Sequence, residues 1–448
     1  MNRRTFTRQT ALASAAVTIL PSFTWSSNKP VRLVFIGVGL RGQHHLDLAL
    51  RRKDVDIIAM CDIDNRMLQM AFDIVKKSGK PMPKIFTGDQ YAWKKMLELK
   101  DIDGVIISTP WEWHTPMILG ALEAGIRYVG TEVVLGITLQ DHWDVVKAAE
   151  RHRAHVMMLE NVCYRRDVLA VLNMVRQGVF GEIIHLQGGY QHDLREVKFN
   201  NGQQPYGGGV EFGEKGFSEA AWRTHHSVHR NGDLYPTHGI GPLAEMININ
   251  RGNRFLLLNS FASKARGLHE YIVKHGGENH PNAKIQFKLG DVVTTQIQCA
   301  NGETILLQHD TNLPRPYSLG FRVQGTKGIW MDVNKSIYLE DVSPQPHRWE
   351  DAKPYLEKYD HPLWKRWSQE TESAGHGGMD FFVLHAFVES IKRRVPTPMD
   401  VYDAAAWSAI TPLSERSIEL GNETVEFPDF TGGQWMYRKN DFALTDEF

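Results

Sequence analysis

A buried strand that ends in a glycine-rich turn is the feature that most limits how this chain folds. Val31–Ile36 is apolar and rich in β-branched residues, as expected for a strand of a parallel sheet, and it runs directly into G-V-G-L-R-G. Gly37 and Gly39 let the backbone turn tightly and approach a pyrophosphate, and Gly42 lets the following helix pack on the strand. The motif predicts a dinucleotide site, with a plain tight turn as the alternative.

An acidic residue after the next apolar run indicates which nucleotide binds. Val55–Cys61 is followed by Asp62, which lies 20 residues past Gly42. A carboxylate at this spacing accepts hydrogen bonds from the adenosine ribose and repels a 2′-phosphate. The sequence therefore favours NAD over NADP.

Strand-like and helix-like segments continue to alternate up to about residue 160. Strands are expected at Gly104–Thr109, Tyr128–Glu132 and His155–Asn161, and helices at His44–Arg52, Thr115–Ala124 and Leu139–Arg153. This alternation predicts an α/β fold, with a doubly wound parallel Rossmann sheet over residues 28–160.

Polar residues gather where these strands end, and ligands of doubly wound sheets bind at that edge. The candidates are Asp62, Thr109–His114 (T-P-W-E-W-H), Glu132 and Asn161. For two of them a structural role is the alternative, because His114 could cap a helix and Asn161 could occupy a turn.

The pattern changes from Gly181 onward, where apolar and polar residues alternate in several runs, including Glu182–Tyr190 and Val292–Cys299. Such alternation is typical of an antiparallel sheet with one covered face. We expect residues 161–448 to form an α+β domain around an open, mainly antiparallel sheet, which could support a homo-oligomer. A long loop at 196–218 is expected to be functional or to cover a site.

Composition excludes several classes of function. Lys and Arg total 51 against 52 Asp and Glu, and this near-neutral balance gives no support for nucleic acid or an anionic membrane as the main partner. No apolar run is long enough to span a bilayer. Cys61, Cys163 and Cys299 are too scattered for a disulfide framework or a zinc knuckle.

The first segment has the pattern of an export signal. Arg3 and Arg4 stand in N-R-R-T-F-T-R and precede the small, apolar stretch Ala11–Leu20. This resembles a twin-arginine signal over residues 1–27, with a short amphipathic helix as the alternative. Periplasmic or secreted localisation is expected, because twin-arginine export carries folded proteins together with a bound cofactor.

Histidines between Trp222 and Pro242 suggest either a metal site or proton transfer. His225, His229, Asp233 and His238 could ligate a metal, but no matched set of supporting acidic residues and histidines accompanies them, so none is predicted. His238 begins an apolar helical run, which suits a proton-transfer group or a helix cap.

With G-T-x-G at Gly325–Gly328, the two-part organisation resembles the Gfo/Idh/MocA oxidoreductase superfamily. Ordinary members carry E-K-P after the fifth strand, with the lysine acting in hydride and proton transfer. This chain has Glu132-Val133-Val134 there, which argues against a conventional sugar dehydrogenase.

A narrower family fits the substituted pattern, and the sequence resembles glycoside hydrolase family 109. The matching segments are T-E-V (131–133), L-E-N-V-C-Y-R-R-D-V (159–168), W-R-T (222–224), R-N-G-D-L-Y-P-T-H-G-I-G-P (230–242), N-R-G-N-R-F (250–255) and H-G-G-M-D (376–380). The resemblance implies an NAD-dependent α-N-acetylgalactosaminidase that acts on small carbohydrates. Its implied reaction moves a hydride from carbon 3 to the nicotinamide, eliminates the aglycone after loss of the carbon 2 proton, adds water and returns the hydride.

The same resemblance assigns site residues. The NAD contacts are Leu40, Arg41, Asp62, Trp111, Glu112, Trp113, His114, Glu132, Val133 and Asn161. The substrate contacts are Tyr190, Arg223, Tyr235, Pro236, Thr237, His238 and Tyr317. Tyr190 and His238 are expected to share acid/base work, with Tyr317 assisting, and which of them removes the carbon 2 proton is left open.

Two other functions remain as alternatives. An exported NAD(P)-dependent sugar oxidoreductase with a tightly bound cofactor would form a keto sugar or lactone. A sugar-binding protein that kept an old cofactor fold would catalyse nothing.

Overall fold

The first sheet is parallel and carries the glycine-rich turn at its centre. The computed structural model describes residues 29–372 and 374–448, so the expected signal at 1–27 lies outside the described residues. The strand order is β3-β2-β1-β4-β5-β6, and every pair in it is parallel. The strands are β1 (Val31–Ile36), β2 (Val55–Cys61), β3 (Lys84–Phe86), β4 (Gly104–Ile107), β5 (Tyr128–Thr131) and β6 (His155–Met158). This confirms the predicted doubly wound sheet, whose order reverses between β1 and β4.

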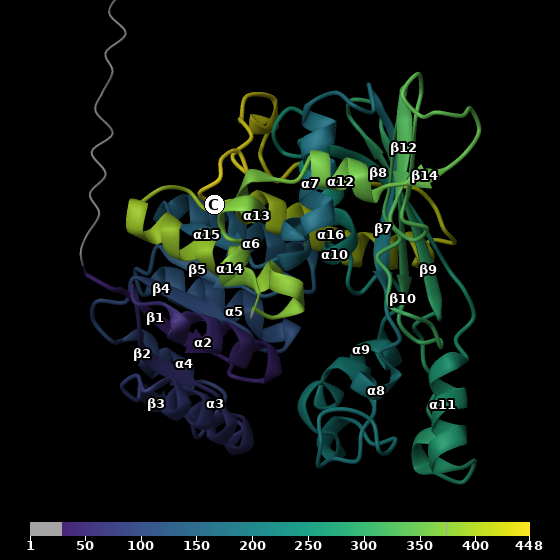
Figure 1. Cartoon of the computed structure of the whole chain (residues 1–448). Coiled ribbons are helices and arrows are strands. Elements are labelled where there is room, and N and C mark those ends of the chain that lie inside the picture. The colour runs from purple at the N-terminus through teal and green to yellow at the C-terminus, as the bar shows by residue number, and fades with distance from the viewer. Residues whose placement is uncertain (1–28, 373) are drawn as a thin grey trace, which may run out of the picture.

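Helices connect these strands and cover the sheet (Figure 1). They are α2 (Leu40–Arg51), α3 (Asn65–Ser78), α4 (Ala92–Leu97), α5 (Trp111–Glu123) and α6 (Leu139–His152). Helix α5 begins at Trp111, four residues earlier than expected, because Pro110 at its N-cap already has a φ of −55°. The first turn of α5 therefore lies at the strand edge where ligands bind.

The second sheet is mixed and mainly antiparallel, as predicted. Its order is β14-β13-β12-β11-β7-β10-β9-β8-β15, and among the described strands of this second sheet only β7 and β10 pair in parallel. The strands are β7 (Ile183–Gln191), β8 (Phe255–Ala262), β9 (Val292–Cys299), β10 (Thr304–Asp310), β11 (Arg322–Gly325), β12 (Gly328–Met331), β13 (Ser336–Leu339), β14 (Glu350–Asp351) and β15 (Val425–Glu426). Phe261 on β8 is an exposed apolar side chain of this sheet. The homo-oligomer that an open sheet face could support stays a prediction.

Helices α7 (Arg166–Arg176), α10 (Thr237–Met246) and α16 (Val401–Glu419) lie between the two sheets. Helix α10 approaches β7 through glycines, since a Cβ built on Gly239 would lie 2.6 Å from the backbone nitrogen of Gly189. Because only glycine fits this contact, the start of α10 is held against the end of β7. This packing brings His238 beside Tyr190.

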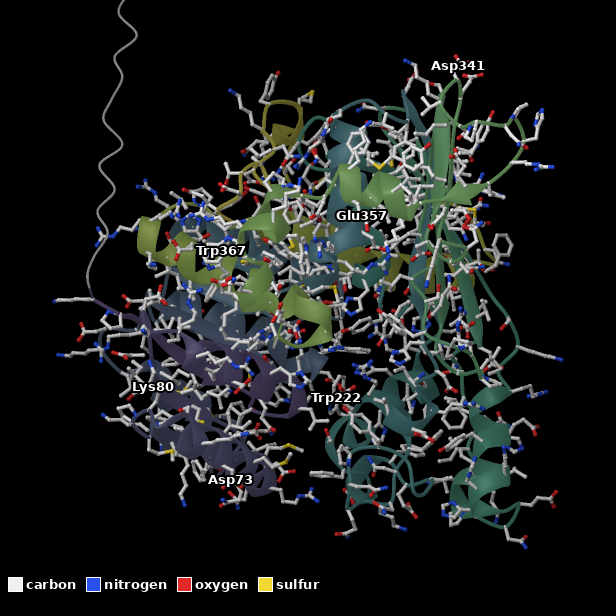
Figure 2. The ribbon with its side chains drawn as sticks, in the orientation of Figure 1. Asp73, Lys80, Trp222, Asp341, Glu357 and Trp367 are labelled. Atoms are coloured by element: carbon white, nitrogen blue, oxygen red, sulfur yellow. The ribbon has the colours of Figure 1, made fainter. Side chains whose placement is uncertain are left out.

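The remaining helices extend or close the two layers. They are α8 (Arg195–Lys198), α9 (Arg223–His229), α11 (Gly267–Gly276), α12 (Lys353–Lys358), α13 (Pro362–Arg366), α14 (Ser368–Thr371) and α15 (Met379–Arg393), with short 3-10 turns at Asn161–Tyr164, Gly213–Lys215, Ser218–Ala221, Pro281–Lys284, His376–Gly378 and Gln434–Met436. Helices α8, α9 and α11 project past the second sheet toward the end of the molecule where β3 and α3 lie (Figure 1). Trp222, at the start of α9, lies between the two halves (Figure 2).

The C-terminal helices pack on the first sheet rather than on the second alone. Helix α15 contacts β1 and α2, and α16 contacts β6 and α6. A Cβ on Gly104 or Gly130 would lie within 3.4 Å of the Phe387 ring, so small residues in β4 and β5 allow α15 to dock closely.

The division of the chain into two domains near residue 160 stays a prediction. Within the described chain, no helix combines the length and apolar character that crossing a bilayer requires.

Candidate active site

A cavity of about 830 Å³ lies where the two halves meet. Its walls come from the carboxyl ends of β1, β2, β4 and β5, from residues after β6, and from β7, α9 and α10. The volume lies within the roughly 300–1,000 Å³ of pockets that bind small ligands and cofactors. Groups predicted for the cofactor and for the substrate therefore line one space.

The glycine-rich turn leaves room for a pyrophosphate at the start of α2. Gly37 has a φ of +86°, and a Cβ on it would lie 2.5 Å from the carbonyl oxygen of Ser108. A Cβ on Gly39 would meet nothing within 4 Å, and Gly39 lines the cavity. Helix α2 has no side-chain cap, so an anion can satisfy its first amide groups. The turn fits a dinucleotide.

Asp62 lies at the end of β2, as predicted, and lines the cavity. Its Oδ2 accepts a hydrogen bond from the Val38 amide at 2.8 Å, and its Oδ1 accepts one from the Asp64 amide at 2.9 Å. Burial raises the pKa of this carboxyl, although the backbone amides oppose the shift. The backbone thus fixes the carboxylate at the position expected to bind a ribose.

A charged cluster forms the wall at the end of β5. Arg41 donates through Nε to Glu132 Oε1 at 2.7 Å and through Nη1 to Asp380 Oδ2 at 2.8 Å. His45 Nε2 lies 2.6 Å from the same Glu132 oxygen. Burial alone would raise the pKa of Glu132, but Arg41 and His45 outweigh it and lower this pKa to about 2. Of these residues, His45 and Asp380 were not predicted.

The cavity has no lysine among its described lining residues. The position after β5 carries Glu132 and Val133, both of which line the cavity. Val133 therefore occupies the position of the acid/base lysine of an ordinary superfamily member and offers no proton-transfer group, while the charge of the adjacent Glu132 is balanced by Arg41.

Most predicted cofactor residues line the cavity, and three do not. Those in the wall are Gly37, Gly39, Leu40, Arg41, Asp62, Trp111, Trp113, Glu132, Val133 and Asn161. Gly42 instead packs on the turn, where a Cβ would lie 2.2 Å from the Gly37 carbonyl oxygen. Glu112 lies 3.2 Å from His226, and the buried His114 ring lies between the carbonyl oxygens of Val134 and Thr109, at 2.5 and 2.8 Å. His114 is therefore buried within the protein, whereas the Glu112 side chain is exposed.

Aromatic and histidine rings form the opposite end of the cavity. The Tyr190 ring lies 4.6 Å from the Tyr235 ring and 5.3 Å from the His238 ring, measured between centroids. Burial raises the pKa of Tyr190 well above its ordinary value, and neighbouring Arg223 only partly opposes this. The Tyr190 phenol is therefore neutral and keeps its O–H.

His238 is held by a carboxylate that sequence reasoning missed. Its Nδ1 lies 2.7 and 2.9 Å from the two carboxylate oxygens of Glu160, which is fully buried. Since His238 lines the cavity and its Nδ1 is occupied, Nε2 is the nitrogen left for a ligand. The signal for Glu160 was a charged residue two positions after the apolar strand β6, within the motif L-E-N.

Arg223 is enclosed by rings. Its guanidinium carbon lies 5.2 Å from the ring centroids of Trp111 and Tyr235 and 5.4 Å from that of Trp222, and its Nε lies 2.6 Å from a carboxylate oxygen of Glu219. Arg223 lines the cavity, so a fixed cation faces the site.

Tyr317 lies at the mouth of the site and is half-exposed. Its ring lies 4.9 Å from that of His192, and His192 Nδ1 lies 3.2 Å from Tyr190 Oη. His192 was not predicted. It directly follows β7, and no motif in the sequence pointed to it.

Pro236 and Thr237 were predicted substrate contacts, but they do not line the cavity, because they form the buried first turn of α10.

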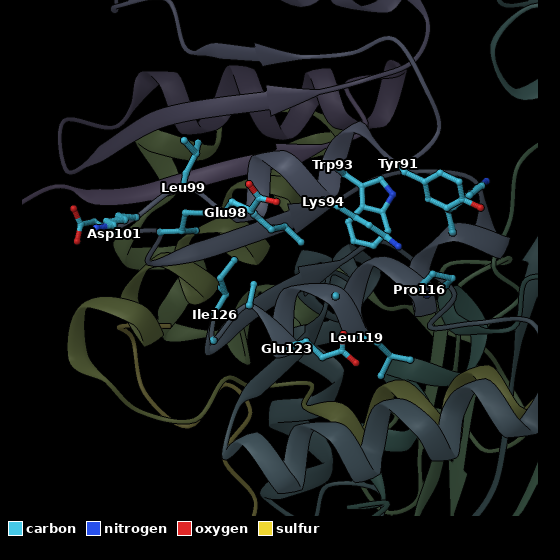
Figure 3. A pocket seen from close by; sticks show the side chains of 17 residues that line it. Tyr91, Trp93, Lys94, Glu98, Leu99, Asp101, Pro116, Leu119, Glu123 and Ile126 are labelled. Carbon is cyan, nitrogen blue, oxygen red and sulfur yellow. The ribbon is translucent and has the colours of Figure 1, made fainter.

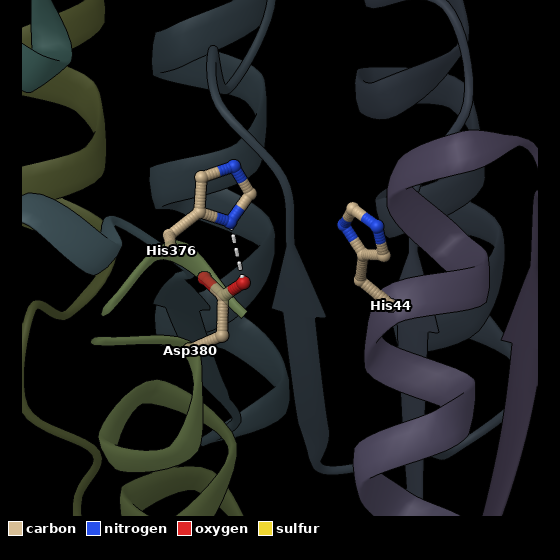
Figure 4. Close-up of side chains that lie close together, drawn as sticks. All are labelled: His44, His376 and Asp380. Atoms are coloured by element: carbon tan, nitrogen blue, oxygen red, sulfur yellow. Dashed lines mark hydrogen bonds and ion pairs between the residues drawn. The ribbon is translucent and has the colours of Figure 1, made fainter. Parts of the chain in front are cut away.

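One group of described side chains has metal-like spacing, and it differs from the histidines considered above. The ligand atoms of His44, His376 and Asp380 lie within 4.8 Å of one another, and Figure 4 shows His44 on α2 facing the other two. Asp380 Oδ2 already accepts from Arg41 and His376 at 2.8 and 2.7 Å. The carboxylate is thus satisfied within the protein.

A second groove, of about 890 Å³, lies between α4 and α5 on the outer side of the first sheet. Figure 3 shows Tyr91 and Lys94 on one side of it and Leu119 and Glu123 on the other. It lacks a cluster like that of the first cavity, so the chemistry is assigned to the first.

Comparison with known proteins identifies the family. Residues 164–437 match "Glycosyl hydrolase 109, C-terminal domain", and residues 31–160 match "Oxidoreductase family, NAD-binding Rossmann fold". The chain belongs to glycosyl hydrolase family 109. This confirms the resemblance found in the motifs, and the protein is a glycoside hydrolase with an NAD-binding domain.

Relatives match over almost the entire length. A glycosyl hydrolase family 109 protein of Stenotrophomonas maltophilia is 59% identical over 100% of this chain and 99% of its own. An alpha-N-acetylgalactosaminidase of Tannerella forsythia is 52% identical over 93% of this chain and 90% of its own.

Solved structures share the fold. Levoglucosan dehydrogenase in complex with NADH has a TM-score of 0.61 at 19% identity, covering 90% of this chain and 100% of that one. An inositol dehydrogenase homologue of Azotobacter vinelandii complexed with NAD+ has a TM-score of 0.63 at 18% identity, covering 89% and 98%.

The depressed pKa of Glu132 predicts a pH-dependent contribution to stability. Because the folded pKa of about 2 lies below the ordinary 4.5, this contribution is present above pH 4.5 and is lost as the pH falls toward 2. Glu132→Gln should therefore cost on the order of 3 kcal/mol at neutral pH and progressively less in acid. Urea unfolding of both proteins across this window measures it, and a difference independent of pH would contradict it.

Proposed function

We propose that this protein hydrolyses terminal α-linked N-acetylgalactosamine without net oxidation, using bound NAD. The observation that carries the proposal is that one cavity joins a dinucleotide site to the Tyr190, His238 and Glu160 cluster while lacking the dehydrogenase lysine. The relative named alpha-N-acetylgalactosaminidase, at 52% identity, supports the substrate.

The residues that would hold NAD are those at the strand ends. Gly39 and the start of α2 would hold the pyrophosphate, Asp62 the adenosine ribose, and Val133 with Asn161 the nicotinamide end. When bound, NAD supplies a reversible hydride acceptor for a carbon of the sugar ring.

The chain's own side chains would move the protons. A carbonyl at carbon 3 of the sugar makes the carbon 2 proton acidic, and His238 is the base that fits its removal. Glu160 orients the imidazole through Nδ1 and stabilises the imidazolium that forms. Tyr190, kept neutral by burial, would protonate the departing aglycone oxygen at carbon 1.

Arg223 would orient the substrate rather than exchange protons. A guanidinium keeps its charge and offers several donors in a fixed plane, which suits the acetamido oxygen or a ring hydroxyl. Tyr317, at the cavity mouth, would contact the sugar and assist in proton transfer.

The function is tested by hydrolysis in heavy water. Purified protein should cleave an aryl α-N-acetylgalactosaminide without a rise in reduced-nicotinamide absorbance, and the released sugar should carry deuterium on carbon 2. An unlabelled carbon 2 would reject the elimination route. Stoichiometric formation of a keto sugar would instead support a sugar oxidoreductase.

The Glu160–His238 pair makes a separate prediction. Glu160→Gln keeps the shape but removes the charge that stabilises the imidazolium, so kcat should fall by about 10²–10⁴-fold with little change in KM. Asp360→Asn is a matched control, because Asp360 is also a buried carboxylate, paired with Arg166, but lies away from the cavity. Equal kcat values for wild type and Glu160→Gln would exclude this role.

We further propose that the chain is exported by the twin-arginine route, on the sequence of residues 1–27, which the structure does not describe. The conservative change Arg3→Lys with Arg4→Lys should retain the protein in the cytoplasm, while the unchanged chain reaches the periplasm with NAD bound. Fractionation followed by nucleotide assay measures both, and identical distributions would refute the proposal.

A further inference from the structure

The motif H-G-G-M-D at 376–380 takes no part in the reaction proposed above, yet its aspartate is fully buried beside the cavity. Asp380 lies in the first turn of α15 and accepts three hydrogen bonds. Two come from residues far away in the sequence, and one comes from the turn just before α15. The donors are Arg41 Nη1 at 2.8 Å, Asn161 Nδ2 at 2.8 Å and His376 Nδ1 at 2.7 Å. Figure 4 shows the His376–Asp380 bond.

The two oxygens of Asp380 have different partners. Oδ2 accepts from Arg41 and His376, whereas Oδ1 accepts from the amide nitrogen of Asn161. Burial alone would raise the pKa of Asp380, but Arg41 and His376 hold it far below its ordinary value. Asp380 is thus a permanently ionised acceptor with no donor to offer.

An acceptor without a donor determines how the Asn161 amide is oriented. A carboxylate can bind only the NH₂ end of the amide, so this bond fixes which end faces Asp380 and leaves Asn161 Oδ1 as the acceptor available to a ligand. Asn161 lines the cavity and is predicted to contact the cofactor. The carboxamide of a nicotinamide offers N–H donors, which a carbonyl oxygen accepts and an NH₂ group does not.

We propose that Asp380 is a positioning residue for NAD, which fixes the Asn161 amide with its carbonyl oxygen available to the bound dinucleotide. The inference rests on NAD binding in the proposed function and not on the sugar chemistry. It extends the site to a residue that touches the cofactor only through another side chain.

Asp380→Asn tests this orientation directly. The new side chain keeps Arg41 and His376 satisfied only if its oxygen replaces Oδ2, and this puts its NH₂ group against Asn161. Asn161 must then turn its own amide and present NH₂ to the cavity. NAD affinity should fall at least about tenfold, since a reversed amide leaves a buried donor facing a donor.

The double variant Asp380→Asn with Asn161→Asp restores the pattern. The carboxylate placed at position 161 accepts from the NH₂ group at position 380 and again presents an oxygen to the cavity, while the total charge is unchanged. The NAD affinity of this double variant should recover most of the loss. Asn161→Asp alone puts two carboxylates together and should bind NAD poorly.

The measurements are bound NAD per purified full-length chain and the NAD dissociation constant after the nucleotide is stripped. Asp360→Asn, a buried Arg-paired carboxylate outside the cavity, should equal wild type in both. Thermal unfolding without nucleotide identifies variants that fail to fold. If Asp380→Asn does not fold, the comparison of Asn161→Asp with the double variant decides.

Wild-type NAD affinity in folded Asp380→Asn would overturn the proposal, and so would a folded double variant that binds no better than its parent single variants. Neither outcome involves the glycosidase assay. A wild-type protein that binds NAD but does not hydrolyse the glycoside would count against the proposed sugar chemistry alone.

Discussion

Parallel pairing of β1 with β2 and β4 aligns the carboxyl ends of the strands at one edge of the first sheet, and the cofactor side of the cavity depends on this alignment. Asp62, Glu132 and Asn161 come from positions far apart in sequence and meet there because parallel strands all end on the same side. The glycine contact between α10 and β7 then holds the histidine and tyrosine of the second half against this edge. Without both constraints, neither set of groups could act on a shared ligand.

Charge compensation within the wall is a second constraint. Arg41 is shared between Glu132 and Asp380, and a buried charge is tolerated only when it is paired and hydrogen-bonded. Removing one partner leaves an uncompensated buried ion, so each of these residues supports both the geometry and the stability of the wall. The cluster also ties α15, late in the chain, to the turn that would hold a pyrophosphate.

The features that could be predicted from the sequence are those that depend on residues close together along the chain. The parallel sheet, the glycine turn and Asp62 follow from a strand, a motif and a spacing within about 30 residues, which is the scale of one βαβ unit. Glu160 and His238 are 78 residues apart, and Asp380 is 219 residues from Asn161, so no pattern along the chain joins them. In the motif T-P-W-E-W-H the tryptophans line the cavity while Glu112 and His114 do not, because successive helical residues point in different directions.

In the reaction proposed above, a dehydrogenase scaffold without its lysine breaks and re-forms a C–H bond at carbon 3 of the sugar during hydrolysis. A substrate deuterated at carbon 3 tests it most directly. Turnover should be slower than with the unlabelled sugar, and the product should still carry the deuterium, because the same hydride returns. Turnover at an unchanged rate, with chemistry that never involves carbon 3, would contradict it.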